Sequence, residues 1–358
     1  MPADEKVDPE KLKYYAKSVF DHMGGAVTAA MIYLGDHMGF YSQLRQTGPV
    51  SPEGLASRLG LSERWVREWL YQQAAAKVIE HDNDGLFWLS PEAVAVLADE
   101  EHPAFGAGTF CQLPATMGAL EHLPESFKTG LGTPYDAWGE DMARGVERGF
   151  APWYRNFLVP VAIPAMQMKD RLMKGIKVAD VGCGGGVAIL ELAKAFPQSH
   201  FYGYEISERA LERAEDNKKK SGVDNVEFHN AARHPMPSDG RFDLILTFDC
   251  LHDMTRPDLI MKQIREGISS DGAWLIADIK ARATFEENVE KNPMAFMMYG
   301  ISIMHCMSSS LSEEDGMGLG TLGLHEGLAR ELAENAGFKN FETLKINHPI
   351  NAFYAVRP

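Results

Sequence analysis

Residues 178–186 are typical of a buried strand that ends in a glycine turn, and the helical pattern of 187–196 follows directly. Glycine lets the backbone adopt positive φ and approach a ligand closely, and the helix after it presents N–H groups that have no intrahelical partner. A second short strand, 200–204, delivers Glu205 at its carboxyl end, nineteen residues after Gly186. A carboxylate at that place can accept hydrogen bonds from both hydroxyls of a ribose. The pattern therefore predicts a site for an adenosine-containing cofactor.

The spacing of the glycines distinguishes between such cofactors. Dinucleotide sites have G-x-G-x-x-G, whereas this chain has Asp180 followed by G-x-G-x-G from Gly182 to Gly186. The acid would repel a pyrophosphate but attract the cationic end of a ligand. The run resembles motif I of class I S-adenosylmethionine-dependent methyltransferases. That resemblance implies that Asp180 and the glycines face the methionine part of the cofactor and that Glu205 faces the ribose, with NAD binding or a purely structural turn as alternatives.

The cofactor contacts implied by this resemblance lie in the glycine turn and directly after the following strands. They are Asp180, Gly182, Cys183, Gly184, Gly186, Glu205, Ile206, Ala231, Ala232, Phe248 and Asp249. Many class I enzymes have an acid near the adenine where this chain has Ala231 and Ala232. The adenine would then rest against small apolar side chains.

Composition excludes several classes of protein. The 358 residues carry a formal net charge of −15, which disfavours nucleic acid and anionic membranes as partners. The four cysteines include no C-x-x-C pair, so we expect free thiols, a reducing cytoplasm and no metal site. The start of the chain, residues 1–6, is polar and does not predict a signal peptide. No apolar stretch approaches the roughly 20 residues of a membrane span.

Residues 1–100 have the pattern of a winged-helix domain. Ser51 and Gly60 mark the ends of one helix, a second follows from 63 to 76, and a hairpin pattern occupies 78–89. Such domains often bind DNA, but this segment has 9 Lys and Arg against 15 Asp and Glu, a net charge of −6. We therefore expect it to form a homodimer instead, with Trp65 and Trp69 on one helix face as buried or interface residues.

The remainder of the chain predicts an α/β domain. A connector rich in glycine, proline and aromatic residues spans 101–170 and is expected either to pack between domains or to form a helical cap. From 171 to 358 helical and strand patterns alternate, which predicts a Rossmann-like parallel sheet. The expected strands are 176–181, 200–204, 225–229, 242–248, 272–278, 341–346 and 351–356, the last two as an antiparallel hairpin at one edge. This final reversal is found in the methyltransferase variant of the fold.

The segment after the 242–248 strand contains His252 and Asp253. It resembles the small-molecule O-methyltransferases of the caffeate and hydroxyindole type, in which a winged-helix dimerisation domain precedes the Rossmann domain. In that family the histidine of a His-Asp pair at this place is the general base. The resemblance implies that His252 is the base, that Asp253 is its companion and that Asp278, at the end of the next strand, orients the imidazole. The alternative is that His252 has a structural or cofactor-side role.

Two positions depart from that family. Met254 stands where a tryptophan commonly follows the His-Asp pair, and His325 lies near the place of a second orienting glutamate. An insertion at 283–322 holds six methionines, and we expect it to form either packing or an apolar lid. His305 within it is a second candidate base.

These features predict a cytoplasmic enzyme that transfers a methyl group from S-adenosylmethionine to a small apolar or aromatic acceptor, at oxygen. Three alternatives remain open. The chain could methylate nitrogen or carbon with the same architecture, it could be a winged-helix regulator that senses S-adenosylmethionine, or it could be a silent scaffold that binds this cofactor. Acidic charge in the first hundred residues counts against the regulator.

Overall fold

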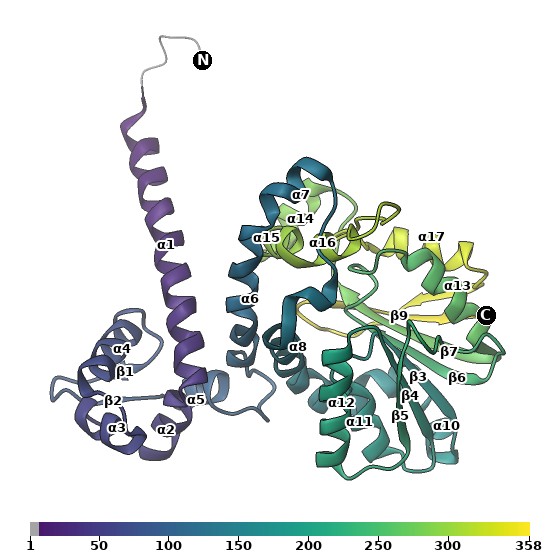
Figure 1. Cartoon of the computed structure of the whole chain (residues 1–358), viewed down its shortest axis with the longest axis horizontal. Helices are drawn as coiled ribbons and strands as arrows, with labels where there is room; N and C mark the ends of the chain where they lie inside the picture. The colour runs from purple at the N-terminus through teal and green to yellow at the C-terminus, as the bar shows by residue number, and fades with distance from the viewer. Residues whose placement is uncertain (1–6) are drawn as a thin grey trace. The chain divides into compact units, whose positions relative to one another are not determined.

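The computed structural model describes residues 7–358, and the polar start of the chain lies outside these residues. The chain divides into two compact units, one ending at Leu113 and the other spanning Pro114–Pro358 (Figure 1). Residues 101–113 of the predicted connector belong to the first unit and 114–170 to the second. No helix of the described residues is long and apolar enough to cross a membrane.

The first unit contains a helix-turn-helix followed by a short antiparallel wing. Its elements are α1 (Pro9–His37), α2 (Phe40–Thr47), α3 (Pro52–Leu59), α4 (Glu63–Ala75), β1 (Glu80–His81), β2 (Phe87–Trp88), α5 (Pro91–Leu97) and η1 (Ala107–Gln112). The Ser51 hydroxyl caps α3 by accepting from the Gly54 N–H at 3.1 Å, and Gly60 ends that helix with φ 66°. Leu55 and Leu70 are completely buried between the helices.

The two tryptophans of α4 have different environments. Trp69 is buried against the rings of Phe40 and Tyr41, and its indole N–H donates to the Met31 carbonyl at 2.9 Å. Trp65, one turn earlier, is 80% exposed. Trp69 is therefore buried as predicted, whereas the interface role of the exposed Trp65 stays a prediction.

Helices fill the first part of the second unit. They are α6 (Leu113–Gly118), η2 (Ala119–Glu121), α7 (Leu123–Thr129), η3 (Tyr135–Trp138), α8 (Gly139–Trp153), η4 (Tyr154–Ala162), α9 (Ile163–Ala165) and α10 (Lys169–Lys174). From α8 to α9 the chain is continuously helical, but η4 has wide π-type turns. Pro152 and Pro160 lie in this stretch, and a proline removes a backbone donor and forces such a local change of winding.

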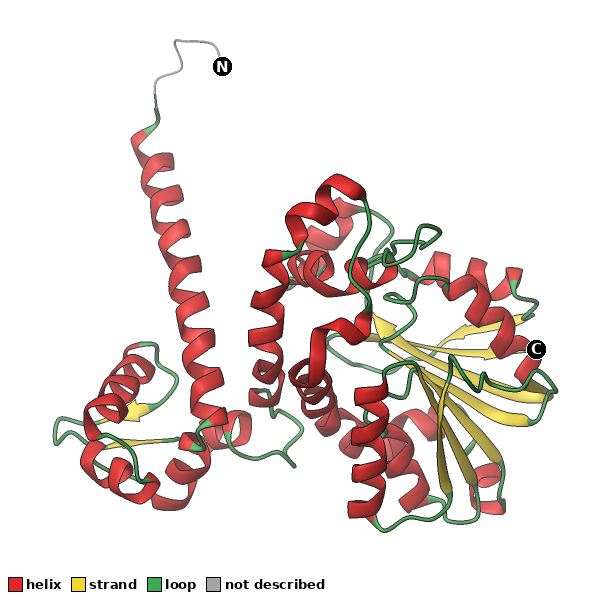
Figure 2. Cartoon of the chain, viewed as in Figure 1, coloured by secondary structure: helices red, strands yellow, loops and turns green. Residues whose placement is uncertain are grey.

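A seven-stranded sheet forms the centre of the second unit (Figure 2). The strands are β3 (Lys177–Val181), β4 (His200–Glu205), β5 (Val226–Asn230), β6 (Phe242–Phe248), β7 (Ile268–Ile279), β8 (Asn340–Thr343) and β9 (Asn351–Arg357), in the order β5-β4-β3-β6-β7-β9-β8. β9 runs antiparallel to both of its neighbours, and the pairs from β5 to β7 are parallel. The predicted fold class is confirmed, and the edge hairpin has β9 on its inner side.

Four helices follow the strands and cover the sheet on both faces. They are α11 (Val187–Ala195), α12 (Glu208–Ser221), α13 (Pro257–Gly267) and α17 (Glu326–Asn335). One buried cluster joins α11 to η4 and one face of the strands, and the other joins α13 and α17 to the opposite face. β7 begins at Ile268 rather than 272, because an irregularity in the pairing with β6 lets Ile268 pair with Phe242.

The methionine-rich insertion is helical and is bonded to two other segments. It contains α14 (Phe285–Lys291), α15 (Ala295–Ile301), η5 (Ser302–Cys306) and α16 (Met307–Ser310). The Gly132 N–H donates to the Leu311 carbonyl at 2.8 Å, and the Gly320 N–H donates to the His252 carbonyl at 3.0 Å. Some of its methionine side chains are buried and others are exposed to solvent. Met298 is buried, whereas Met297 is 44% exposed.

Gly203 in β4 permits a stability prediction. A Cβ at this position would lie 2.6 Å from the Phe228 ring and 2.8 Å from Cys183 Sγ, so the neighbours would have to move. We expect Gly203→Ala to lower the free energy of unfolding by about 1–3 kcal/mol through overpacking, measured by urea denaturation. Gly300→Ala serves as control, because a Cβ at this position in α15 meets nothing within 4 Å. It should raise the free energy of unfolding by no more than about 1 kcal/mol. Equal effects would contradict the packing argument.

Candidate active site

The glycine turn after β3 is held against the end of β4. The N–H groups of Gly182 and Cys183 both donate to the Tyr204 carbonyl, at 2.8 and 3.1 Å. Gly182, Gly184 and Gly186 have φ of 74°, 52° and 74°, a region that L side chains rarely adopt. A Cβ at Gly186 would lie 2.6 Å from the Phe228 ring, whereas a Cβ at Gly184 meets nothing within 4 Å. Gly184 therefore turns its open side away from the protein, as a residue facing a ligand would.

Asp180, in β3 directly before the turn, is buried without a hydrogen-bond partner. Its residue is 1% exposed, and neither carboxyl oxygen has a partner among residues 7–358. Burial raises the pKa of Asp180 to about 8, and the nearby Glu205 carboxylate adds to the shift. An unpaired buried acid is costly unless something pairs with it. The α-ammonium of the predicted cofactor is a cation of the right kind, so Asp180 fits that group.

Glu205 ends β4 and organises the backbone around it. Its Oε2 accepts from the Gly184 N–H at 2.9 Å, and its Oε1 accepts from the N–H groups of Ile206 and Ser207 at 2.8 and 2.9 Å. Burial raises the pKa of Glu205, and the three N–H groups partly oppose this. Each carboxylate oxygen can accept more than one hydrogen bond, so capacity for a ribose hydroxyl remains on Oε2.

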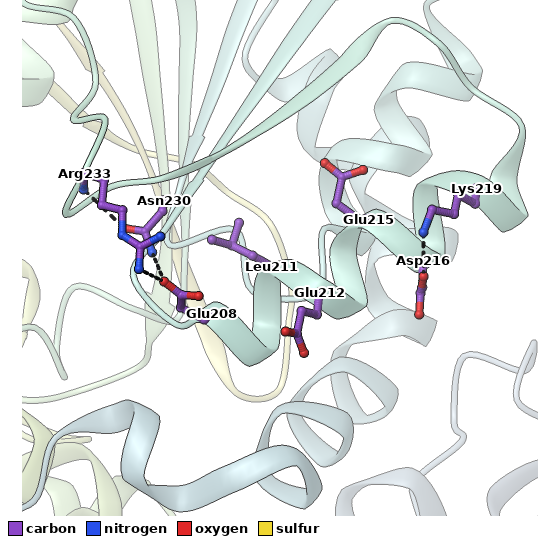
Figure 3. A pocket seen from close by; sticks show the side chains of 8 residues that line it. All are labelled: Glu208, Leu211, Glu212, Glu215, Asp216, Lys219, Asn230 and Arg233. Carbon is purple, nitrogen blue, oxygen red and sulfur yellow. Dashed lines mark hydrogen bonds and ion pairs between the residues drawn. The ribbon is translucent and has the colours of Figure 1, made fainter.

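The predicted adenine contacts lie after β5. The Ala231 N–H donates to the Glu205 carbonyl at 2.9 Å, and Ala232 is exposed. A depression on the neighbouring surface of α12 has Asn230, Glu208 and Arg233 together at one end, where Arg233 pairs with Glu208 at 2.5 Å (Figure 3). The rest of its lining is Leu211, Glu212, Glu215, Asp216 and Lys219, so it is an acidic helix face next to the predicted adenine position.

His252, in the loop after β6, and Asp278, near the carboxyl end of β7, form a buried pair. Nδ1 of His252 lies 2.6 Å from Oδ1 of Asp278, and the two residues are 4% and 1% exposed. The same Oδ1 accepts from the Ile279 N–H at 2.7 Å, which fixes the carboxylate. Burial alone would lower the pKa of the imidazole, but the Asp278 carboxylate and the neighbouring Cys306 side chain hold the pKa of His252 well above its ordinary value.

Two further predicted residues flank this pair. Asp249 has a φ of 49° and accepts a hydrogen bond from the Asn351 amide, and burial raises the pKa of its carboxyl. Burial raises the pKa of Asp253 to about 7, with His252 opposing the shift and Asp278 adding to it. Phe248 is buried against the ring of Trp153, so its side chain contributes to the core.

Sequence reasoning missed several residues that the fold brings to this place. Tyr135 of η3 lies near Glu205, Asp253 and Cys306, and burial together with these groups raises the pKa of its phenol. Tyr154 of η4 similarly lies near Asp249 and Asp180. Both come from the connector, whose aromatic residues are conspicuous in the sequence but have no periodicity that would indicate which of them face a site.

His305 and His325 make hydrogen bonds to residues other than Asp278. Nε2 of His305 lies 2.9 Å from the Thr116 hydroxyl, and burial lowers the pKa of His305 to about 4. His325 caps α17, where its Nδ1 accepts from the Leu328 N–H at 3.3 Å. Within the described part of the chain, no three His, Cys, Asp or Glu side chains are grouped as metal ligands would be.

Comparison with known families identifies both parts of the chain. Residues 172–319 match a methyltransferase-domain family, and residues 26–99 match the Rv2258c-like winged HTH domain. A ubiquinone biosynthesis O-methyltransferase of Leptothrix cholodnii is 27% identical over 154 residues, which are 42% of this chain and 60% of that protein. Methyltransferase GfsG of Streptomyces halstedii is 31% identical over 175 residues, 46% of this chain and 62% of GfsG. The chain thus spans about three fifths of the length of these two curated relatives.

Solved structures resemble the chain over nearly its whole length. Human N-acetylserotonin methyltransferase, solved in complex with SAM, has a TM-score of 0.71 at 14% identity and covers 100% of this chain and 99% of its own. The mitomycin 7-O-methyltransferase MmcR has a TM-score of 0.68 at 19% identity, and the match covers 98% of this chain and 100% of MmcR. At these identities the likeness concerns the fold. The chain thus contains a methyltransferase domain preceded by a winged helix-turn-helix domain, and its fold is that of these solved structures, which confirms the predicted resemblance.

The unpaired Asp180 carboxyl predicts proton release on cofactor binding. With a pKa of about 8 it is mostly protonated at pH 7, and an ammonium partner would favour its ionised form. We expect S-adenosylhomocysteine, titrated calorimetrically in buffers of different ionisation enthalpy at pH 7, to release roughly one proton. Asp180→Asn should abolish the release and weaken binding by about tenfold or more. The exposed Asp216→Asn is the matched control, and equal release from all three proteins would contradict the assignment.

Proposed function

We propose that this chain transfers a methyl group from S-adenosylmethionine to a hydroxyl oxygen of a small apolar or aromatic acceptor, with His252 as general base. The observation that carries the proposal is the 2.6 Å contact of His252 with Asp278, buried beside the glycine turn. The loops are adjacent, because a Cβ at Gly182 would lie 2.9 Å from Cys250 Sγ, two residues before His252. The relatives named as O-methyltransferases support the choice of oxygen.

The cofactor end of the site is assigned to the residues around the glycine turn. When bound, S-adenosylmethionine supplies a methyl group on a sulfonium, which a nucleophile can displace directly. Asp180 would pair with the ammonium, Glu205 would accept from the ribose, and the turn from Gly182 to Gly186 would lie against the methionine part. Ala231 and Ala232 would contact the adenine. The chain's main task is then to hold donor and acceptor in line, since positioning supplies much of the rate enhancement.

Asp278 gives His252 the form that a base requires. A carboxylate 2.6 Å from Nδ1 holds the proton on that nitrogen, which leaves Nε2 as the atom that can take a proton from an acceptor hydroxyl. A neutral phenol is a weak nucleophile, so removal of its proton accelerates the transfer. Cys306 and Asp253 lie next to the imidazole, and Asp253 adds negative charge that stabilises the imidazolium after the proton moves.

The acceptor end would be formed by the insertion and the connector. The 252–255 segment is bonded to the insertion, because the Ser310 hydroxyl donates to the Met254 carbonyl at 2.8 Å and the Met317 N–H donates to the Thr255 carbonyl at 2.9 Å. Met304 packs against the cluster that contains Trp138. Methionine and aromatic side chains suit a flat apolar molecule, which supports an aromatic acceptor.

The pairing of His252 with Asp278 predicts a pH profile. Because the pKa of His252 is held well above its ordinary value, the base form increases only as the pH rises, and so the rate of methyl transfer to a phenol should rise from neutral into alkaline pH. Asp278→Asn removes the carboxylate, so the rising limb should move to lower pH while the maximal rate falls by roughly 10²-fold or more. The measurement is kcat/KM against pH on a panel of simple phenols.

His252→Gln provides the complementary test. It should lower kcat by roughly 10²- to 10⁴-fold while S-adenosylhomocysteine binding changes by no more than a few-fold. If cofactor binding collapses instead, His252 belongs to the cofactor side and the base assignment is wrong. An amine acceptor that is turned over equally by wild type and His252→Gln would favour N-methylation.

We also propose that the first unit forms a homodimer through α1. The apolar side chains Leu12, Tyr15, Val19 and Met23 recur along one side of this helix and are each at least 59% exposed. Exposed apolar stripes of this kind mark interfaces, and a second copy of the same helix is a complementary occupant. The relatives with this winged-helix architecture support the proposal as far as fold is concerned.

Substitution in α1 tests the dimer. Val19→Glu places a charge in the stripe and should convert the dimer to monomer, measured by light scattering coupled to size exclusion, because a buried unpaired charge is strongly unfavourable. Lys17→Glu changes charge near the opposite side of α1, where Lys17 pairs with Asp21, and should leave the mass unchanged. A wild-type protein that is monomeric at micromolar concentration would refute the proposal.

A further inference from the structure

Two buried ring nitrogens near the insertion have no hydrogen-bond partner among the described residues. They are Nε1 of Trp138, which ends η3, and Nδ1 of His305, in η5. Trp138 is only 8% exposed, so its indole N–H is removed from bulk water. Buried polar atoms in folded proteins are nearly always satisfied, and an exception calls for a partner that is a ligand or an ordered water.

The two nitrogens belong to rings that are in contact with each other, and we call this pair of nitrogens the uncharged polar point. The rings meet edge to face, with centroids 5.0 Å apart and planes at 88°. His305 keeps its other nitrogen on the Thr116 hydroxyl at 2.9 Å, and burial keeps the imidazole neutral at pH 7. Around Trp138 the contacts are apolar and include Met142 and Met304. Such a setting suits a neutral oxygen better than an ion, because a charged group would be poorly solvated there.

Both segments that carry this polar point, η3 and η5, also carry a residue that lies near the proposed reaction site. Trp138 shares η3 with Tyr135, which lies near Asp253 and Glu205. His305 directly precedes Cys306, which lies against His252. A further contact holds the loop before η3 to the insertion, since the Thr133 N–H donates to the Ser308 hydroxyl at 2.9 Å. These contacts place Trp138 and His305 on the two segments that border His252, where a second polar group of an acceptor held at His252 would meet them.

We propose that Trp138 and His305 bind a carbonyl oxygen of the acceptor, so that the substrate is a neutral aromatic molecule carrying both a hydroxyl group and a ketone or quinone carbonyl. The Trp138 N–H donates to the carbonyl, and so does Nδ1–H of His305 in the tautomer whose Nε2 accepts from the Thr116 hydroxyl. This second contact orients the molecule so that its hydroxyl faces His252. The inference rests on the function proposed above and adds the class of substrate to it.

The test uses pairs of phenols that differ in a single carbonyl. A short pair is 6-hydroxy-1-tetralone with 5,6,7,8-tetrahydro-2-naphthol, and a long pair is 4-hydroxybenzophenone with 4-benzylphenol. Dissociation constants are measured by calorimetry with saturating S-adenosylhomocysteine at a pH below the phenol pKa values. We expect the wild type to prefer the ketone of at least one pair by roughly fivefold to tenfold, the scale of one neutral hydrogen bond.

Variants separate recognition from packing. Trp138→Phe keeps a ring but removes the N–H, and should abolish the ketone preference while the carbonyl-free phenols bind within about twofold of wild type. His305→Phe should reduce the same preference and carries the test if Trp138→Phe does not fold. Met142→Leu, in the same apolar cluster, is the matched control and should keep the preference.

The outcomes distinguish this inference from the proposed function. Loss of S-adenosylhomocysteine binding in the wild type would overturn the proposed function itself. If the cofactor binds and phenols are methylated, the inference alone fails when neither pair shows a ketone preference or when the preference survives in both variants. A site occupied only by water would give that failing pattern, with Trp138→Phe lowering the melting temperature and leaving the affinities of each pair equal.

Discussion

Four carboxyl groups lie close together at one edge of the sheet. The arrangement of the site depends on how neighbouring groups offset the cost of burying their negative charge. Burial raises the pKa of Asp180, Glu205, Asp249 and Asp253, because water cannot solvate them there. Three of these four carboxyl groups have a neighbouring group in the chain that offsets the cost of burial. Glu205 accepts hydrogen bonds from three backbone N–H groups, and Asp249 accepts one from the Asn351 amide. Asp253 lies beside the His252 imidazole, which pairs with Asp278. Asp180 differs from the other three because both of its carboxyl oxygens are buried without a hydrogen-bond partner within residues 7–358, and it is the carboxyl group that we propose pairs with a cation.

Strand direction explains why these groups meet. β3, β4, β6 and β7 are parallel, so the residues at their carboxyl ends lie along a single edge although they are far apart in the chain. β9 runs the opposite way, and its first residue, Asn351, therefore pairs with Ile279 at this same edge and reaches Asp249. The one reversal in the sheet thus supplies a hydrogen-bond donor where a parallel strand would have supplied its carboxyl end.

Helical segments outside the sheet border the proposed site. η3 brings Tyr135 to the carboxylates and Trp138 to His305, so one short helix contacts both the cofactor end and the acceptor end of the proposed site. The insertion is bonded to the His252 segment through Gly320 and Ser310. In the function that we propose, acceptor identity would depend on these segments, whose sequences have the least regular patterns.

The sequence by itself determined the sheet, the glycine turn and the class of protein, because these depend on local patterns. All seven expected strands are present, and β6 occupies the residues predicted for it. Only the tertiary structure decided the partners. The distance between His252 and Asp278 depends on the register of β6 with β7, and Trp65 and Trp69 have equal helical patterns but opposite burial. Tyr135, Trp138 and His305 meet because of how the chain folds back between distant segments, and no local periodicity records such long-range contacts.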